Sequence, residues 1–135
     1  MIKDIDRPKV EDIAIAAVPE TNEETGADEW NIYLMNMKPV EINNVLVASR
    51  GYGTIRGEEV KTSELRHYVE ALPANSYVKI EPIMEDVFPL NNQYWVSFYI
   101  EKKIFDKKYV FLPETVQRSN LTEIALMGKK GVLLS

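Results

Sequence analysis

Residues 93–113, QYWVSFYIEKKIFDKKYVFLP, decide the fold class of this chain. The first half sets Tyr94, Val96 and Phe98 on one face of an extended chain and the residues between them on the other. An alternation with a period of two is typical of a β-strand that has one face in a hydrophobic core. The second half, KIFDKKYVFLP, is again rich in β-branched and aromatic residues. We therefore predict an antiparallel hairpin that turns at Glu101 and Lys102, with its alternate residues at the centre of the core.

The same alternation recurs along the chain in other short runs, each bounded by Pro, Gly, Asn or Asp. These runs are VEDIAIAAV, EWNIYLMNMK, NVLVAS, SYVKIEPI and LTEIALM. In SYVKIEPI the alternation sets Val78 and Ile80 on one face and Tyr77, Lys79 and Glu81 on the other. Most of the seven prolines lie at the ends of apolar runs, where a missing N–H does least harm to a ladder. Even spacing of such strands predicts two sheets that each hide one face against the other.

One segment, TSELRHYVEAL at residues 62–72, has two interpretations. Leu65, Val69 and Leu72 lie at helical spacing, with Ser63 as a possible cap. With a period of two, Leu65, His67 and Val69 line one face instead. The Leu-Pro bend that follows is typical of immunoglobulin-like and fibronectin-like sandwiches, so we favour a strand. The predicted fold is an all-β, antiparallel, two-sheet immunoglobulin-like sandwich of seven to eight strands.

Composition predicts one domain over residues 1–135. The chain is 45% hydrophobic and 10% aromatic, which suffices for a continuous core. Cysteine is absent, which excludes a disulfide scaffold, a thiolate zinc site and a cysteine nucleophile. With a single histidine, a histidine-rich metal site is excluded as well. We expect neither a metal nor a cofactor.

Charge and hydropathy predict a cytoplasmic protein without a membrane or nucleic-acid partner. The first 13 residues carry many charges and lack an apolar core of signal-peptide length. The longest apolar run, IAIAAVP, is too short to span a bilayer. The net charge of -5 disfavours binding to a phosphate backbone. The only basic cluster, EKKIFDKK at residues 101–108, also contains Glu101 and Asp106 and is typical of a solvated hairpin tip.

The stretch ASRGYGTIRGEEV, residues 48–60, contains three glycines and looks like a phosphate-binding loop. A dinucleotide fingerprint needs a glycine where this chain has Arg56, and a P-loop needs a Gly-Lys-Ser/Thr triplet that does not occur. The two glutamates after Gly57 would repel an anion. We therefore expect a turn near Gly53, with glycine supplying a positive φ or a bulge.

Within this stretch, Gly51-x-Gly53-x-x-Arg56 resembles part of the third motif of class II aminoacyl-tRNA synthetases. In that family the arginine binds ATP and leads straight into a hydrophobic helix. Here Gly57 and two glutamates follow, which breaks the pattern. The resemblance implies ATP binding through Gly51, Gly53 and Arg56 as an alternative function.

His67 is the only histidine, and any Ser-His-Asp arrangement would depend on it. Ser63 and Glu64 lie nearby in the sequence. A lone histidine beside Arg66 is more often a surface or partly buried hydrogen-bonding residue, and we expect that role and no catalytic residue.

Two further groups of residues favour structural over functional interpretations. KIEPIMEDV supplies Glu81, Glu85 and Asp86 as possible calcium ligands, but the EF-hand order is absent and a solvated loop is expected. Large aromatic residues usually fill cores, so we expect Trp30 and Trp95 to be buried.

The run YVKIEPIMEDVFPLNNQYWVSFYI, together with IFDKKYVFLPE, resembles a family of short uncharacterised bacterial proteins. The resemblance extends from PKVEDIAIAAVPE to KKGVLLS. Members of that family are sometimes labelled as a phenylalanyl-tRNA synthetase chain, which implies ATP, phenylalanine and tRNA. The family pattern implies an immunoglobulin-like β-sandwich and assigns no catalytic residue.

The leading hypothesis is a non-catalytic interaction module that binds an unknown protein partner. The candidate binding surface comprises Arg50, Tyr52, Arg56, Arg66 and His67, with Tyr52 exposed, because Arg and Tyr are frequent in interfaces and Gly allows close approach. Alternatives are a phenylalanyl-type synthetase chain that binds ATP or tRNA, and a small-ligand or carbohydrate binder that uses exposed aromatic residues. A sandwich also has edge strands, so a homodimer through an edge strand is a further possibility.

Overall fold

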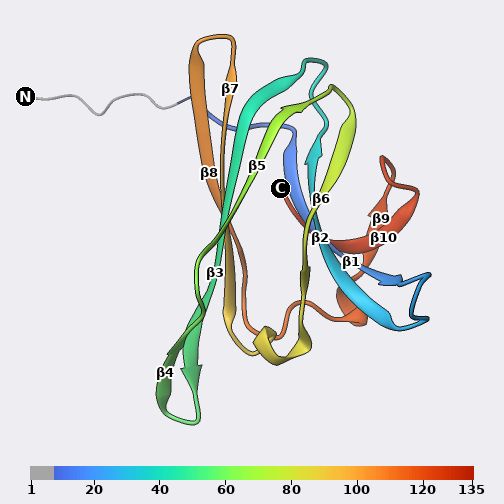
Figure 1. Ribbon diagram of the computed structural model, residues 1–135, viewed down its shortest axis with the longest axis vertical. Coiled ribbons are helices and arrows are strands. Elements are labelled where there is room, and N and C mark those ends of the chain that lie inside the picture. Colours follow the sequence, from blue (N-terminus) through green and yellow to red (C-terminus); the bar gives the residue numbers. More distant parts are fainter. Residues whose placement is uncertain (1–7) are drawn as a thin grey trace, which may run out of the picture.

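The computed structural model describes residues 8–135 as two antiparallel sheets of five strands each, which lie face to face (Figure 1). The all-β, two-sheet sandwich predicted from the alternation is confirmed. The first sheet contains β1 (Ile13–Thr21), β2 (Asp28–Asn36), β6 (Ser76–Ile83), β9 (Thr122–Ile124) and β10 (Lys129–Leu134). The second sheet contains β3 (Ile42–Ile55), β4 (Glu58–Lys61), β5 (Leu65–Leu72), β7 (Asn91–Ile100) and β8 (Lys103–Phe111). The helical segments of residues 8–135 are two single 3₁₀ turns, η1 (Glu85–Val87) and η2 (Arg118–Asn120).

The strands follow the order β6-β2-β1-β10-β9 in the first sheet and β4-β3-β7-β8 in the second. The long strand β3 also pairs with β5, on the edge opposite to β7, so β5 and β4 lie one after the other along it. The ten strands exceed the predicted seven to eight. Within residues 8–135, β9 lies in the predicted run LTEIALM, whereas β4 and β10 correspond to none of the predicted runs. Strand β4 has only four residues, which is too short for an alternating pattern to show in the sequence.

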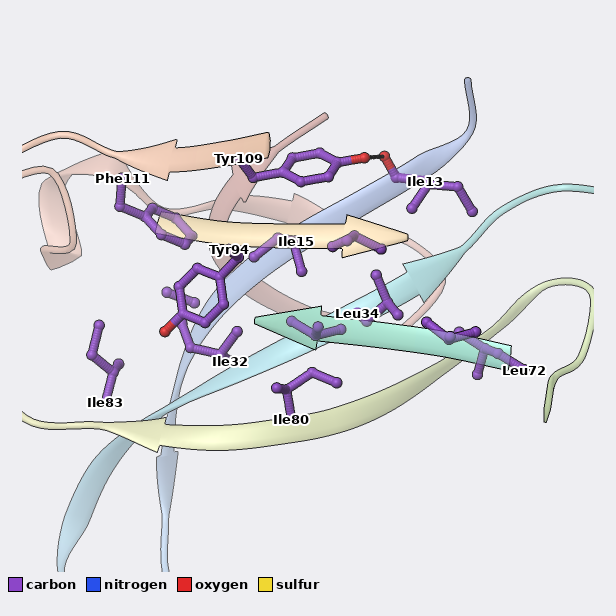
Figure 2. Packing of buried hydrophobic residues seen from close by; sticks show 14 of the residues in the cluster. Ile13, Ile15, Ile32, Leu34, Leu72, Ile80, Ile83, Tyr94, Tyr109 and Phe111 are labelled. Carbon is purple, nitrogen blue, oxygen red and sulfur yellow. Dashed lines mark hydrogen bonds between the residues drawn. The ribbon is translucent and has the colours of Figure 1, made fainter. Parts of the chain in front are cut away.

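The hairpin of β7 and β8 lies at the centre of the core, as predicted. Tyr94, Val96 and Phe98 of β7 are buried, as are Tyr109 and Phe111 of β8. Figure 2 shows the rings of β7 and β8 among the isoleucine and leucine side chains of the first sheet. Full burial of one such side chain stabilises the native state by about 1.5–3 kcal/mol.

Strand β1 is buried on both faces, because the C-terminal strands cover the side that faces away from the core. Ile13 and Ile15 belong to the main core. On the other face, small β1 residues and Met35 of β2 pack against Ile124 and Met127, which belong to β9 and the turn before β10. The outer face of the first sheet is therefore closed over β1 by the chain's own C-terminal segment.

Of three further expectations, two are confirmed and one is wrong. The ambiguous segment is the strand β5, with Tyr68 opposite Leu46 and Val69 opposite Val45 of β3, as favoured. Trp30 is buried, as expected, and its ring meets Phe88 edge-on. The burial expected for Trp95 is wrong, since 42% of this residue is exposed. Successive side chains of a strand point to opposite faces, so Trp95 points away from the face of its buried neighbours in β7. Only a bulge would turn it toward the core.

Candidate functional site

The outer face of the second sheet carries an exposed apolar and aromatic stripe. Tyr68 is 63% exposed and Ile104 is 53% exposed, and both belong to this stripe together with half-exposed side chains of β3 and β7. We call these residues the aromatic face: Leu46, Tyr68, Trp95, Tyr99 and Ile104.

The strand register makes this stripe continuous across the sheet. Leu46 lies directly opposite Tyr68 of β5. On the neighbouring strands, Trp95 lies opposite Ala48 of β3, and Tyr99 lies opposite Ile104 of β8. Directly opposed side chains in an antiparallel pair are neighbours on the same face. The aromatic face therefore extends from β5 over β3 and β7 to β8.

Polar contacts hold two of the rings in place. The Tyr68 hydroxyl donates a hydrogen bond of 2.6 Å to Oδ1 of Asn44. The indole Nε1 of Trp95 donates to Oδ2 of Asp106 at 3.3 Å, and Nζ of Lys108 lies 4.5 Å from the centre of the Trp95 ring. Side chains that are already ordered lose less conformational entropy when a partner binds.

Three of the five predicted binding residues lie on this same side of the sheet. The guanidinium of Arg50 lies 5.4 Å from the ring centre of Tyr52, two positions along β3. Tyr52 is half-buried rather than exposed as expected. Arg66 lies opposite Ala48, and its Nη2 forms an ion pair of 3.1 Å with Oε2 of Glu64. The structure thus brings Arg50, Tyr52 and Arg66 beside the aromatic face.

Arg56 lies apart from this group, at the turn between β3 and β4. The expected turn near Gly53 is placed too early, because Gly53 lies inside β3 and the chain reverses at Arg56 and Gly57. Both turn residues have positive φ, 52° and 81° respectively. The hairpin extends beyond the body of the sandwich (Figure 1). Gly51 has a packing role, since a Cβ there would lie 3.1 Å from the methyl carbon of Thr62.

His67 faces the other side of the second sheet and joins it to the first. Its Nε2 lies 2.6 Å from Oε1 of Glu81 on β6. Ser49 donates to the same oxygen at 2.8 Å, and the Tyr94 hydroxyl donates to Oε2 at 3.2 Å. Burial, and then the charge and hydrogen bond of Glu81, raise the pKa of Tyr94 well above its usual value. His67 is the partly buried hydrogen-bonding residue that was predicted.

These contacts do not form a nucleophile relay. In a Ser-His-acid arrangement the serine bonds to the imidazole, whereas Ser49 donates directly to the carboxylate of Glu81. Among the residues that the structure describes, neither Ser63 nor Glu64 is a hydrogen-bond partner of His67. The network instead satisfies a carboxylate that is held between the two sheets.

The solvated loop expected for Glu81 is wrong, because Glu81 lies in β6 with its side chain turned inward. Glu81 pairs with Ile32 while Lys79 pairs with Tyr33, so Ile80 is an extra residue in β6. Such a bulge reverses the parity of the residues that follow it. The apolar spacing changes from two between Val78 and Ile80 to three between Ile80 and Ile83, which is the only sequence signal for it.

A second polar cluster, around Glu20 of β1, joins β1 to β2 and β10 within the first sheet. Asn31 and Tyr33 of β2 donate hydrogen bonds of 2.8 Å and 2.6 Å to Oε1 of Glu20, and the ammonium of Lys129 donates to Oε2. Burial alone would raise the pKa of Glu20, but the hydrogen bonds from Lys129, Tyr33 and Asn31 outweigh it and lower this pKa. The cluster links three strands, because the acceptor Glu20 lies on β1 and the donors lie on β2 and β10.

Within residues 8–135, no group of three or more His, Asp or Glu side chains is placed to hold a metal ion. In the same part of the chain, no helix has the length and apolarity needed to cross a membrane. No protein-family model, curated protein or solved structure matches the chain.

Proposed function

We propose that this chain is a non-catalytic interaction module that binds a protein partner through the aromatic face. One observation carries the proposal: an apolar stripe runs across four strands of the second sheet and is open to solvent. The corresponding face of the first sheet is closed over β1 by Ile124 and Met127. Among residues 8–135, the C-terminal segment thus covers the outer face of the first sheet over β1, whereas the outer face of the second sheet stays open.

The residue types on this face suit a protein interface. Tyr, Trp and Arg are over-represented among the residues that dominate binding energy. Trp95 and Tyr68 supply large rings, and Arg50 and Arg66 flank them. Contiguous exposed apolar surface of this kind is uncommon on monomers unless a partner binds there. Four hydrogen-bonded strands of the five-stranded second sheet also present the rings on a rigid support.

The strand order supports the immunoglobulin-like relationship expected from the sequence. In such sandwiches, strands A, B and E share one sheet and strands C, F and G share the other. Here β1, β2 and β6 occupy the positions of A, B and E, and β3, β7 and β8 occupy those of C, F and G. We infer this relationship from strand order alone, and the function rests on the aromatic face instead.

The proposal is tested by affinity capture from native lysate with quantitative mass spectrometry. The wild-type chain is compared with a Trp95→Ala/Tyr68→Ala double variant. Tyr77→Ala is the matched control, because Tyr77 is an exposed tyrosine on the first sheet. We expect proteins that the wild type and the control retain to be depleted about tenfold or more by the double variant.

Two results would contradict the proposal. The first is a captured set that the double variant leaves unchanged, or the absence of any protein enriched over a blank resin. The second is a rise in melting temperature with ATP-magnesium that Arg56→Ala abolishes, because a ligand specific to the native state stabilises it. That outcome would favour the synthetase-related alternative.

A further inference from the structure

A pocket of about 320 Å³ opens between β3 and the C-terminal end of β6. Its volume is roughly ten times the ~30 Å³ that a water molecule occupies in the liquid. Ser49, Glu81 and Tyr94 line it, together with Leu65, Ile83 and Met84. The pocket lies on the opposite side of the second sheet from the aromatic face, since Ser49 and Tyr94 have the inward parity of β3 and β7.

The charge of the pocket is set by Glu81. Only 13% of its side chain is exposed. Its hydrogen-bond partners are Ser49, His67 and Tyr94, and its one ion-pairing partner among the described residues is the imidazole of His67. Taking a carboxylate out of water costs free energy that a neighbouring cation offsets. Glu81 thus lacks the permanent positive charge that usually accompanies a buried carboxylate.

One acceptor position on Glu81 is still available. An ionised carboxylate can accept about four hydrogen bonds. Within the part of the chain that the structure describes, Oε1 accepts from Ser49 and lies against His67, whereas Oε2 accepts from Tyr94 alone. Oε2 can therefore accept a further N–H donor.

The other charges at the pocket do not neutralise Glu81. Asp86 adds a second carboxylate to the lining. Among residues 8–135, the only cation that lines the pocket is Arg50, and its guanidinium lies over the ring of Tyr52 on the other side of the sheet. The excess of negative charge near Glu81 therefore favours a cationic ligand.

The rim of the pocket is apolar. Leu65 and Met84 are exposed although they are large hydrophobic residues, and Ile83 lies beside them. An alkyl chain placed between these side chains would remove apolar surface from water on both sides. An apolar rim above a carboxylate matches a ligand that has a charged head and an aliphatic stem.

We propose that this pocket binds an alkylammonium group, with the ammonium at Oε2 of Glu81 and the alkyl stem between Leu65 and Met84. The group belongs either to a free aliphatic amine or to a lysine side chain of a peptide. The pocket is a second site, independent of the aromatic face. Its ligand is selected by charge and chain length, because the carboxylate binds the head and the apolar rim binds the stem.

The test is an NMR titration of the isotope-labelled chain with n-hexylammonium chloride, with n-hexanol as the neutral probe of the same length. We expect saturable shifts of the Ser49, Leu65 and Ile83 amides, binding at least about tenfold weaker for hexanol, and weaker binding in added salt. Glu81→Gln reduces the affinity about tenfold or more, whereas Glu59→Gln on the exposed hairpin leaves it unchanged.

If Glu81→Gln disturbs folding, the Asp86→Asn variant is used instead to test whether acidic groups bind the ammonium. Asp86 is exposed and is not a hydrogen-bond partner of Glu81, so this change should leave the fold intact. It is expected to weaken hexylammonium binding a few-fold in a chain with wild-type amide dispersion. Parallel titrations with N-acetyl-lysine amide and a lysine-containing peptide show whether the source is a free amine or a protein. The proposal is overturned by shifts that do not saturate, by equal binding of hexanol, or by two acidic-residue variants that bind as the wild type does.

The Trp95→Ala/Tyr68→Ala variant keeps this test separate from the function proposed above. It removes two rings of the aromatic face and none of the pocket lining. We expect it to bind hexylammonium with wild-type affinity. Loss of partner capture with retained amine binding supports both proposals, and retained capture with lost amine binding contradicts both.

Discussion

The hydroxyl of Tyr109 donates a hydrogen bond of 2.7 Å to the backbone carbonyl oxygen of Ile13, which lies 96 positions earlier in the chain. The bond joins β8 of the second sheet to the first residue of β1, and Figure 2 shows it at the edge of the core. Burial raises the pKa of Tyr109, so the hydroxyl remains a donor throughout the neutral range. A buried polar bond of this kind sets how the two sheets are placed at this end of the sandwich.

Removal of that hydroxyl should destabilise the protein without changing its fold. Tyr109→Phe keeps the ring in the core but leaves the carbonyl of Ile13 without this donor. We expect a loss of about 1–2 kcal/mol in the free energy of unfolding, measured by urea denaturation. Tyr99→Phe on the outer face is the control and should change it by less than about 0.5 kcal/mol. Equal midpoints for the two variants would show that the bond adds nothing to stability.

Glu20 and Lys129 should make stability depend on pH. The folded-state pKa of Glu20 lies below its unfolded value of 4.5, so the stability that it contributes is present above that value and is lost as pH falls through the folded pKa. Lys129→Met should cost about 1 kcal/mol at pH 7 and less at pH 3. Melting temperatures across this range measure the difference. Lys9→Met, which breaks an exposed ion pair with Glu11, should leave the profile unchanged. A Lys129→Met effect that is the same at both pH values would contradict this account.

Gly131 should tolerate no larger residue, because β10 approaches β1 closely there. A Cβ at this position would lie 2.8 Å from Cδ1 of Ile124 and 3.0 Å from the carbonyl oxygen of Ala17. We expect Gly131→Ala to destabilise the chain by about 1–3 kcal/mol in thermal or urea unfolding. Adding Ile124→Val removes the nearest methyl group and should recover part of the loss, while the contact with the Ala17 backbone persists. Full stability of Gly131→Ala alone would disprove the close approach.

A substitution in the turn formed by Arg56 and Gly57 should raise the stability of the protein. Two adjacent residues with positive φ in a two-residue hairpin loop favour Asn followed by Gly, whereas arginine has no such preference. We expect Arg56→Asn to raise stability by up to about 1 kcal/mol, and Gly57→Ala to lower it by about 1 kcal/mol. Differential scanning calorimetry measures both changes. A stabilising Gly57→Ala would show that φ at this position is negative in solution.

For Trp95, the size of the side chain and its position in the alternating pattern predict opposite locations. Its size favours burial, but its position between Tyr94 and Val96 places it on the opposite face. The alternation gives the correct result because a strand with one face in the core exposes every second side chain, whatever its size. Burial was expected from size for Trp30 as well, and there it is confirmed because Trp30 shares its face with the buried Ile32 and Leu34.

The sequence by itself determined the fold class and the faces of the longer strands, apart from the part of β6 that follows Ile80. The two-residue period and the positions of the prolines specified an all-β sandwich, because side-chain alternation is a local property that each strand carries in its own residues. It also placed the central hairpin and its turn correctly.

Only the tertiary structure decided how distant residues meet. The bulge at Ile80 turns Glu81 toward His67, and the C-terminal strands close one outer face while the aromatic face stays open. Strand order and register depend on pairings between residues far apart in the chain, and no local pattern encodes these. Both candidate sites arise at such long-range junctions, which is why the sequence named some of their residues but not their arrangement.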